Sequence, residues 1–175
     1  MLIVGDNLRD LCLQHAVVNN IDAYDVTSLT LRLNIRVTSV TTEAVIDYGK
    51  PLKQNWVNEY DIPEEGVELK RNTGLLGCSE EVIHMPIGYF GLVQTKGSLA
   101  RLFVSATCNA GQIDSGFRGR ITFELLNLGN LKVRIPRLAP VAQLFIFRTS
   151  TKNVAPYAGR YMNAEKPTIY QPKLS

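Results

Sequence analysis

Hydrophobic and polar residues follow two periods along the chain, first that of a helix and then that of strands. Residues 7–16 have apolar side chains at helical spacing behind Asp6, so we expect a short N-terminal helix capped by Asp6. From residue 28 to residue 37, apolar and polar side chains alternate, which predicts a half-buried strand. The chain therefore begins with a helix and continues as strands.

The later hydrophobic runs are short and are separated by turn residues. They lie at residues 67–70, 74–78, 81–85, 88–94, 99–106, 120–126, 131–135 and 141–147. Many short strands with Gly and Pro between them predict a mainly β fold, a sandwich or a barrel. Residues 149–175 lack clear periodicity and are rich in Pro, Tyr and Lys, so we expect an irregular tail there.

Composition narrows the class of protein. A chain of 175 residues with 45% hydrophobic and 20% charged residues fits one globular domain with a sizeable core. The net charge of +3 is too small to indicate nucleic acid, although an anionic small molecule is compatible with it. No apolar run approaches the roughly 20 residues that span a bilayer, and the N-terminus does not resemble a signal peptide. We therefore expect a cytoplasmic protein that binds neither nucleic acid nor membrane.

The residues that most often bind metals or act as nucleophiles are few. Cys12, Cys78 and Cys108 are odd in number and widely spaced, which favours buried free thiols in a reducing compartment. His15 and His84 are the two histidines, and no Cys-x-x-Cys or His-x-Glu motif is present, so a deaminase-type zinc site is not predicted. The chain also lacks a P-loop and a Rossmann fingerprint, and nothing supports a Ser-His-Asp or Cys-His nucleophile.

Glu124 lies in an otherwise apolar run. The strand predicted at residues 120–126 places apolar side chains on one face, and Arg120, Thr122 and Glu124 on the other. A buried carboxylate is costly unless it is paired or has a chemical role. From the pattern alone, a surface glutamate paired with Arg120 is the favoured interpretation. The alternative is that Glu124 lines a cleft or a subunit interface.

Two turn sequences precede this strand. Residues 114–119 read Asp-Ser-Gly-Phe-Arg-Gly, and an Asp that opens such a turn ordinarily caps it. Residues 96–101 read Lys-Gly-Ser-Leu-Ala-Arg. Backbone N–H groups beside Gly97 and Ser98, together with Lys96, could hold phosphates. Arg101 could bind a carboxylate or a phosphate with two hydrogen bonds.

These motifs resemble those of the dCTP deaminase and dUTPase family of trimeric nucleotide hydrolases. The most specific is the Gly-x-Ile-Asp turn with an aromatic residue and a second glycine, at residues 111–119. Residues 81–86 are similar to the strand that leads into the family's phosphate motif, and residues 99–101 are similar to the end of that motif. Residues 140–147 resemble the last core strand. The likeness extends from about Gly74 to Tyr161.

The resemblance implies a dUTPase-like distorted β-barrel or jelly roll with a short N-terminal helix. Residues 1–148 would form this domain, and residues 149–175 would form a tail that folds over the active site. The family also implies a homotrimer with sites between subunits. Its substrate would be a deoxynucleoside triphosphate, and Mg²⁺ would be carried by the phosphates rather than by protein ligands.

Glu124 places the resemblance closer to the deaminase branch. Deaminases have a Glu ten residues after the motif Asp, where dUTPases normally have an apolar residue, and Glu124 follows Asp114 at this spacing. The implied enzyme converts dCTP to dUTP, with a further step to dUMP left open. Glu124 would take a proton from the water that attacks C4 of cytosine, Arg101 would hold the water or the carboxylate, and Asp114 would lie near the sugar. The implied substrate-binding residues are Lys96, Gly97, Ser98, Ala110, Gln143, Tyr157, Arg160 and Tyr161.

Two alternatives remain open. A pure dUTPase would hydrolyse dUTP to dUMP and pyrophosphate and would not need Glu124. A catalytically weak nucleotide-binding relative is favoured by Gly97, where the family motif usually has Ser, and by Ala164, where deaminases carry Gln.

Overall fold

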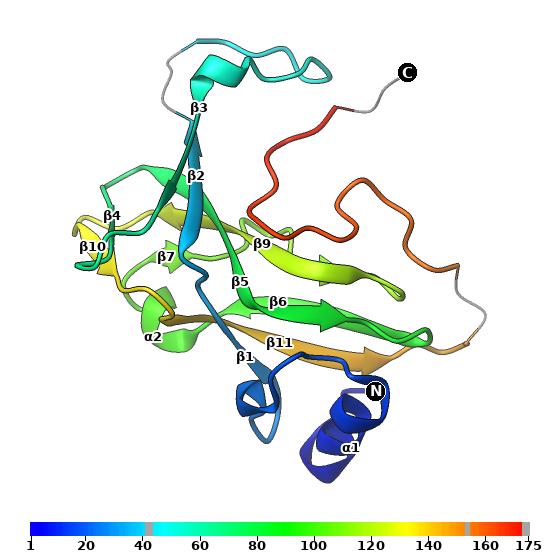
Figure 1. The fold of residues 1–175 in the computed structure, drawn as a ribbon. Coiled ribbons are helices and arrows are strands. Elements are labelled where there is room, and N and C mark those ends of the chain that lie inside the picture. The colour runs from blue at the N-terminus through cyan, green and yellow to red at the C-terminus, as the bar shows by residue number, and fades with distance from the viewer. Residues whose placement is uncertain (41–43, 153–154, 173–175) are drawn as a thin grey trace.

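Strands make up most of the regular secondary structure. The computed structural model describes residues 1–40, 44–152 and 155–172. Its strands form two main antiparallel sheets with a small third sheet, and the N-terminal helix lies at one end of the molecule (Figure 1). The expected mainly β architecture with a short N-terminal helix is confirmed.

The first sheet has four strands in the order β1-β11-β6-β8. They are β1 (Leu29–Arg32), β6 (Tyr89–Thr95), β8 (Gln112–Ile113) and β11 (Pro140–Arg148). The second sheet has five strands in the order β3-β2-β5-β9-β7. They are β2 (Arg36–Val40), β3 (Val57–Asp61), β5 (Gly74–His84), β7 (Val104–Ser105) and β9 (Arg118–Asn127).

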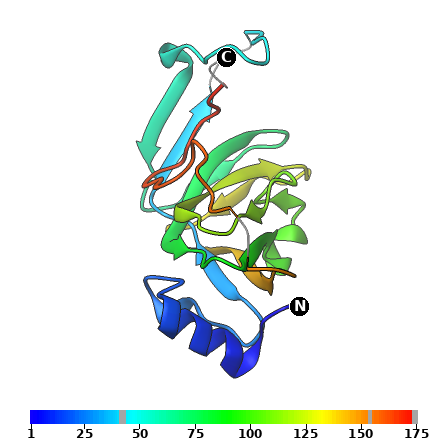
Figure 2. The ribbon, with the colours of Figure 1, turned by 90° about the vertical axis from the view of Figure 1, so that its right-hand side faces the viewer.

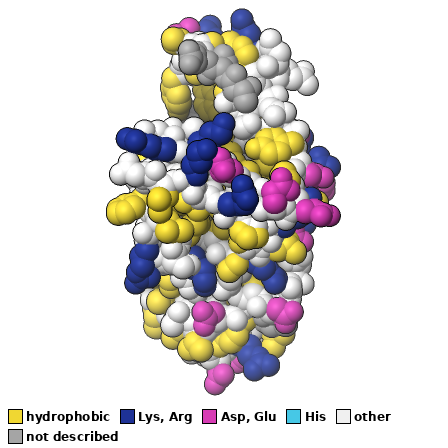
Figure 3. Space-filling view, turned by 90° about the vertical axis from the view of Figure 1, so that its left-hand side faces the viewer, with side chains coloured by type: hydrophobic (Ala, Val, Ile, Leu, Met, Phe, Trp, Pro, Cys, Tyr) yellow, Lys and Arg dark blue, Asp and Glu magenta, His cyan; other side chains and the backbone are white. Residues whose placement is uncertain are grey.

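A third, two-stranded sheet pairs β4 (Val67–Leu69) with β10 (Val133–Ile135). Hydrophobic side chains lie between Lys, Arg, Asp and Glu side chains on the face that includes these strands (Figure 3). Inside the molecule, the apolar faces of the main sheets share one hydrophobic core. Phe123 and Leu125 of β9 reach it from one sheet and Leu144 and Ile146 of β11 from the other, all fully buried.

The helix α1 (Gly5–His15) agrees with the predicted segment, but its capping does not. Val4 is the N-cap residue and no side chain caps the helix, so the prediction that Asp6 is the cap is wrong. Asp6 lies in the first turn, where its negative charge still suits the helix dipole. Leu8, Leu11 and Cys12 are the buried residues of the helix, which is followed by the 3₁₀ turn η1 (Ile21–Ala23).

The alternating run at residues 28–37 forms two strands instead of the predicted one. β1 pairs with β11 in the first sheet, whereas β2 pairs with β3 and β5 in the second. Between them, the N–H of Leu33 donates to Ala139 O at 2.9 Å and the N–H of Asn34 donates to Cys78 O at 2.8 Å. The backbone therefore leaves one sheet for the other at these residues, which alternation of side chains cannot reveal.

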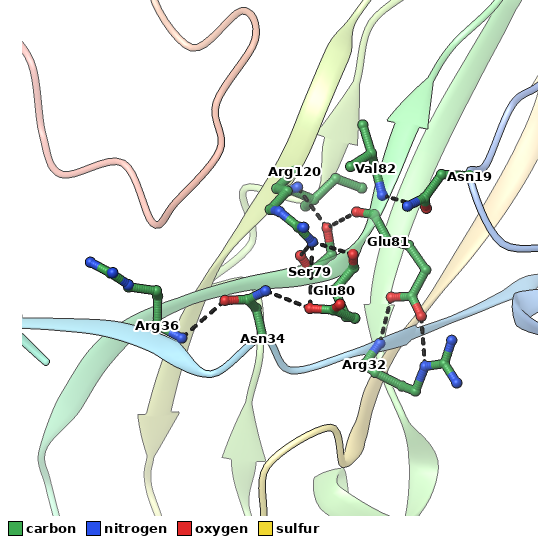
Figure 4. A network of polar contacts seen from close by, with 10 residues as sticks. Asn19, Arg32, Asn34, Arg36, Ser79, Glu80, Glu81, Val82 and Arg120 are labelled. Carbon is green, nitrogen blue, oxygen red and sulfur yellow. Dashed lines mark hydrogen bonds and ion pairs between the residues drawn. The ribbon is translucent and has the colours of Figure 1, made fainter. Parts of the chain in front are cut away.

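The predicted runs 74–78 and 81–85 belong to the single long strand β5, which is interrupted by a bulge between Cys78 and Val82. A polar network fills this bulge (Figure 4). Glu81 is only 1% exposed, and its carboxylate accepts hydrogen bonds from the backbone N–H and the Nε of Arg32, each at 2.8 Å. The Ser79 hydroxyl accepts the N–H of Ile121 of β9 at 2.9 Å.

The prediction of a strand at residues 99–106 is wrong for the first half of this run. The run begins inside the short helix α2 (Gly97–Ala100), and its only strand is β7 near the end. Phe103 between them has a φ of 59°, which breaks any strand. Sequence patterns also missed β3, β8 and the 3₁₀ turn η2 (Gln54–Trp56).

Residues 155–172 of the C-terminal segment form neither a helix nor a strand, which agrees with the irregular tail expected there. Residues 153–154 and 173–175 of the predicted tail lie outside the described residues. Cys12 and Cys78 are buried free thiols as predicted, whereas Cys108 is exposed, so the prediction of burial is wrong for that residue. Among the described residues, no helix is both long and apolar enough to span a membrane.

Candidate active site

The side-chain faces of β9 alternate as the sequence predicts. Residues 119, 121, 123 and 125 are buried in the core, whereas Arg120, Thr122 and Glu124 are half-buried on the other face. This second face lines a cavity of about 640 Å³ that also includes Asp114, Ala110, Tyr157 and Tyr161. Five of the eleven residues predicted for the site, including Glu124 itself, therefore line one cavity.

Glu124 has an unusual environment for a carboxylate. Its Oε2 atom is buried and has no hydrogen-bond partner within the described part of the chain. Burial raises the pKa of Glu124 from 4.5 to about 7, while a hydrogen bond from its own backbone opposes this shift. Near neutral pH this group can therefore hold and release a proton, as a general acid or base must.

The predicted pairing between Glu124 and Arg120 is wrong. Arg120 is turned toward the bulge of β5, where its guanidinium donates to Ser79 O at 3.0 Å and to Glu80 O. It also forms an ion pair with the Glu80 carboxylate at 3.5 Å (Figure 4). The Coulombic partner of Arg120 is thus Glu80, and among the described residues Glu124 forms no ion pair with a cation.

The turn that carries Asp114 is held tightly against the first sheet. A Cβ atom at Gly111 would lie 2.4 Å from Val93 O, so only glycine fits this approach to β6. The N–H of Phe117 donates to Asp114 O at 3.1 Å and closes the turn. The Asp114 side chain is exposed and lines the cavity.

A second turn, at residues 105–110, forms another part of the cavity wall. The Ser105 hydroxyl accepts the N–H of Cys108 at 3.2 Å, and both Cys108 and Asn109 have left-handed backbone with φ of 41° and 68°. The Cys108 thiol donates to the backbone O of Glu124 at 3.6 Å. Burial and the nearby Glu124 raise the pKa of this thiol. Sequence reasoning did not assign Cys108 to the site, and its isolation from other motifs gave no signal.

The C-terminal segment closes one side of the cavity. The ring of Tyr157 packs on that of Phe117 with 5.8 Å between the ring centroids. The backbone N–H of Tyr157 donates to Ser115 O at 2.8 Å. Tyr161 lines the cavity, whereas Arg160 is exposed and its guanidinium donates to Gln171 O. Of the predicted tail residues, two therefore face the cavity of Glu124 and Arg160 does not line it.

The predicted phosphate residues lie elsewhere in the single chain. Arg101 lines a separate hollow with Leu102, Phe103 and residues 128–131. Lys96, Gly97 and Ser98 belong to the start of α2 and do not line the cavity of Glu124. Gln143 of β11 is also outside it, and its amide donates to Ser28 Oγ at 3.1 Å. The roles given to these residues stay predictions.

A metal site built by the protein would need several suitable side chains in one place. Within residues 1–40, 44–152 and 155–172, no three His, Cys, Asp or Glu side chains gather in a cluster that could hold a metal ion. The expectation that Mg²⁺ arrives on the phosphates of a nucleotide stays a prediction.

Comparisons with known proteins agree with the geometry. The family model described as dCTP deaminase-like matches residues 3–149. The "dCTP deaminase, dUMP-forming" of Aquifex aeolicus is 33% identical over 134 residues, which cover 77% of this chain and 72% of the relative. The protein of the same name from Methanoculleus marisnigri is 31% identical over 149 residues, which cover 81% of this chain and 78% of that relative.

A solved structure supports the fold. The crystal structure of 2'-deoxycytidine 5'-triphosphate deaminase from Agrobacterium tumefaciens matches with a TM-score of 0.64 at 19% identity. The match covers 83% of this chain and 47% of that one, so this chain spans about half the length of that neighbour. The predicted dUTPase-like fold and the predicted deaminase branch are both confirmed. The chain belongs to the dCTP deaminase-like family of enzymes.

Proposed function

We propose that this protein deaminates dCTP to dUTP without zinc and carries the product on to dUMP. The observation that carries the proposal is Glu124, a carboxylate in a cavity large enough for a nucleotide base and sugar, with a buried oxygen that has no hydrogen-bond partner in the described part of the chain. The second step is supported by relatives named "dCTP deaminase, dUMP-forming".

Glu124 would act as the base and then as the acid of the first step. In its ionised form it accepts a proton from water, and the resulting hydroxide attacks C4 of cytosine. Glu124 then gives this proton to N3 of the ring, takes the proton of the new hydroxyl at C4 as the C4=O bond forms, and passes it to the amino group, which leaves as ammonia. The sum is dCTP and water to dUTP and ammonia. A pKa of about 7 suits both transfers, because the carboxylate is neither too weak a base nor too weak an acid at neutral pH.

The second step would use Asp114. In this step water attacks the phosphate chain of dUTP, releasing pyrophosphate and leaving dUMP. Asp114 is exposed at the cavity and could orient that water. Mg²⁺ bound to the triphosphate would neutralise phosphate oxygens as a part of the substrate. Tyr157 and Tyr161 would cover the bound nucleotide from the tail.

The phosphate half of the site would come from another subunit of a homotrimer. Lys96, Gly97, Ser98 and Arg101 do not reach the cavity of Glu124 within one chain. Next to Arg101, Leu102, Phe103, Leu128 and Leu131 are exposed, and contiguous exposed apolar side chains are typical of interaction surfaces. Association through this surface would bring the cations of one subunit to the carboxylates of another.

A product assay tests the proposal directly. Purified protein is incubated with dCTP and Mg²⁺, and nucleotides are separated by ion exchange. We expect dUMP, pyrophosphate and ammonia from the native protein, and from Glu124→Gln at least about 10²-fold less ammonia and deoxyuridine nucleotide. Hydrolysis of dUTP that ignores dCTP and survives Glu124→Gln would instead identify a dUTPase. Nucleotide binding without turnover would identify a catalytically weak relative.

A further inference from the structure

Thr122 occupies the position next to Glu124 on the cavity face of β9. Side chains two residues apart on one strand point to the same face and are separated by about 7 Å. Both side chains are half-buried and both line the cavity. Thr122 has no role in the chemistry described above, yet it lies where a contact could act on the surroundings of Glu124.

The C-terminal segment adds to the edge of β9 that faces away from β5. The N–H of Asn163 donates to Arg118 O and the N–H of Arg120 donates to Ala164 O, both at 2.7 Å. This parallel bridge requires Gly119, which has a φ of +134° and whose Cβ would lie 2.7 Å from Ala164 N. The tail therefore binds β9 by main-chain hydrogen bonds just before it reaches Thr122.

A single side-chain hydrogen bond continues this attachment across the cavity. The N–H of Thr168 donates to the hydroxyl oxygen of Thr122 at 3.0 Å, and Pro167 beside it is buried. Both Thr168 and Tyr170 line the cavity of Glu124. In addition to the main-chain hydrogen bonds at residues 163–164, the Thr122 hydroxyl therefore attaches to β9 the part of the tail that lines the cavity.

Beyond Thr168 the tail reaches the loop before β3, as two views show (Figures 1 and 2). The hydroxyl of Tyr170 accepts the N–H of Gly49 at 2.7 Å, and its ring lies 5.8 Å from that of Tyr48. Lys166 forms an ion pair with Glu59 of β3 at 2.6 Å. The segment at residues 163–170 therefore spans from β9 to this loop, and we call it the strap. Thr122 contacts the strap at Thr168, between these two attachments.

We propose that Thr122 is a positioning residue of the candidate active site, whose hydroxyl fixes the strap of residues 163–170 over the cavity beside Glu124. This deepens the proposed function and rests on it for the identity of the nucleotide. Thr122 does not touch reacting atoms. Its hydrogen bond increases the fraction of molecules in which the strap lies over the cavity, and the apparent affinity for the nucleotide rises in proportion to that fraction.

The experiment compares three variants in the full chain. Thr122→Val keeps the shape of the side chain and removes the acceptor, Thr122→Ser keeps the acceptor, and Thr168→Pro removes the donor from the other side. Two readouts are measured, amide hydrogen exchange of residues 163–170 and steady-state kinetics with dCTP. If Thr122→Val does not fold, Thr168→Pro tests the same hydrogen bond.

For Thr122→Val and Thr168→Pro we expect faster exchange in the strap and a KM raised by about three- to tenfold, the range for one neutral hydrogen bond. We expect kcat within about twofold of the native value, and Thr122→Ser to restore both readouts. Unchanged exchange and unchanged KM in both variants would overturn the proposal, as would a loss confined to kcat. Faster exchange in a protein that never turns over dCTP would support the strap and contradict only the proposed function.

Discussion

Two glutamates in neighbouring strands, Glu81 and Glu124, show how differently a carboxylate can be accommodated. Glu81, in the bulge of β5, receives two hydrogen bonds at 2.8 Å from Arg32 and forms an ion pair with it. Glu124, in the middle of β9, has a buried oxygen with no partner in the described residues, and burial raises its pKa to about 7. A paired carboxylate holds the sheets together, whereas an unpaired one retains the capacity to move a proton.

Replacing Glu124 gives the largest expected effect. Glu124→Gln keeps the size of the side chain and removes the base, so we expect dCTP turnover to fall by about 10²- to 10⁴-fold. Thermal unfolding should show a folded protein, and dCTP should still cause a thermal shift. Retention of more than a tenth of the native deamination rate would show that Glu124 is not the base.

Replacing Glu81 should produce the opposite pattern. Glu81→Gln breaks a buried ion pair in the β5 bulge (Figure 4). We expect the free energy of unfolding to fall by about 2–4 kcal/mol, less than for a fully buried pair because Arg32 is partly exposed. Denaturant unfolding measures this loss. Activity per folded molecule should stay within about threefold, and a selective loss of turnover at full stability would contradict a structural role.

A smaller effect is expected in the pH dependence of the free energy of unfolding, which should differ between the native protein and Glu124→Gln. The native pKa of Glu124, about 7, lies above its ordinary value of 4.5, so between these pH values the native protein binds more protons than the unfolded chain. Its stability relative to Glu124→Gln should therefore fall as pH rises from 4.5 to 8, by about 1–2 kcal/mol after allowing for partial exposure. Equal pH dependence in both proteins would contradict the raised pKa.

The sequence pattern predicted which side chains of β9 share a face, but not which residues of other strands they contact. Alternation alone placed Glu124 on the face opposite Phe123, because side-chain direction in a strand has period two. The partner of Arg120 could not be predicted, since Glu80 comes from a distant bulge. Alternation also could not show that the run containing Leu33 changes sheets, because long-range hydrogen bonds cause the change.

The family resemblance predicted the fold, and three of the residues that it implied for the site, Asp114, Tyr157 and Tyr161, line one cavity with Glu124. It did not include the nearby Cys108, which reaches the site through a left-handed turn. Nor could sequence alone show that Arg101 lies outside the cavity of its own chain. Arg101 directly follows the short helix α2, where the sequence pattern predicts a strand from residue 99 onward.

The pH dependence of kcat/KM for dCTP deamination tests the central claim most directly, since it reports the ionisation of the free enzyme's base. Rates are measured from pH 5 to pH 9 at constant ionic strength, with the release of ammonia as the readout. The burial that raises the pKa of Glu124 predicts that kcat/KM rises with pH and levels off above an apparent pKa near 7. A profile that is flat down to about pH 5 would mean that Glu124 ionises as an ordinary carboxylate, and would contradict the role proposed for it.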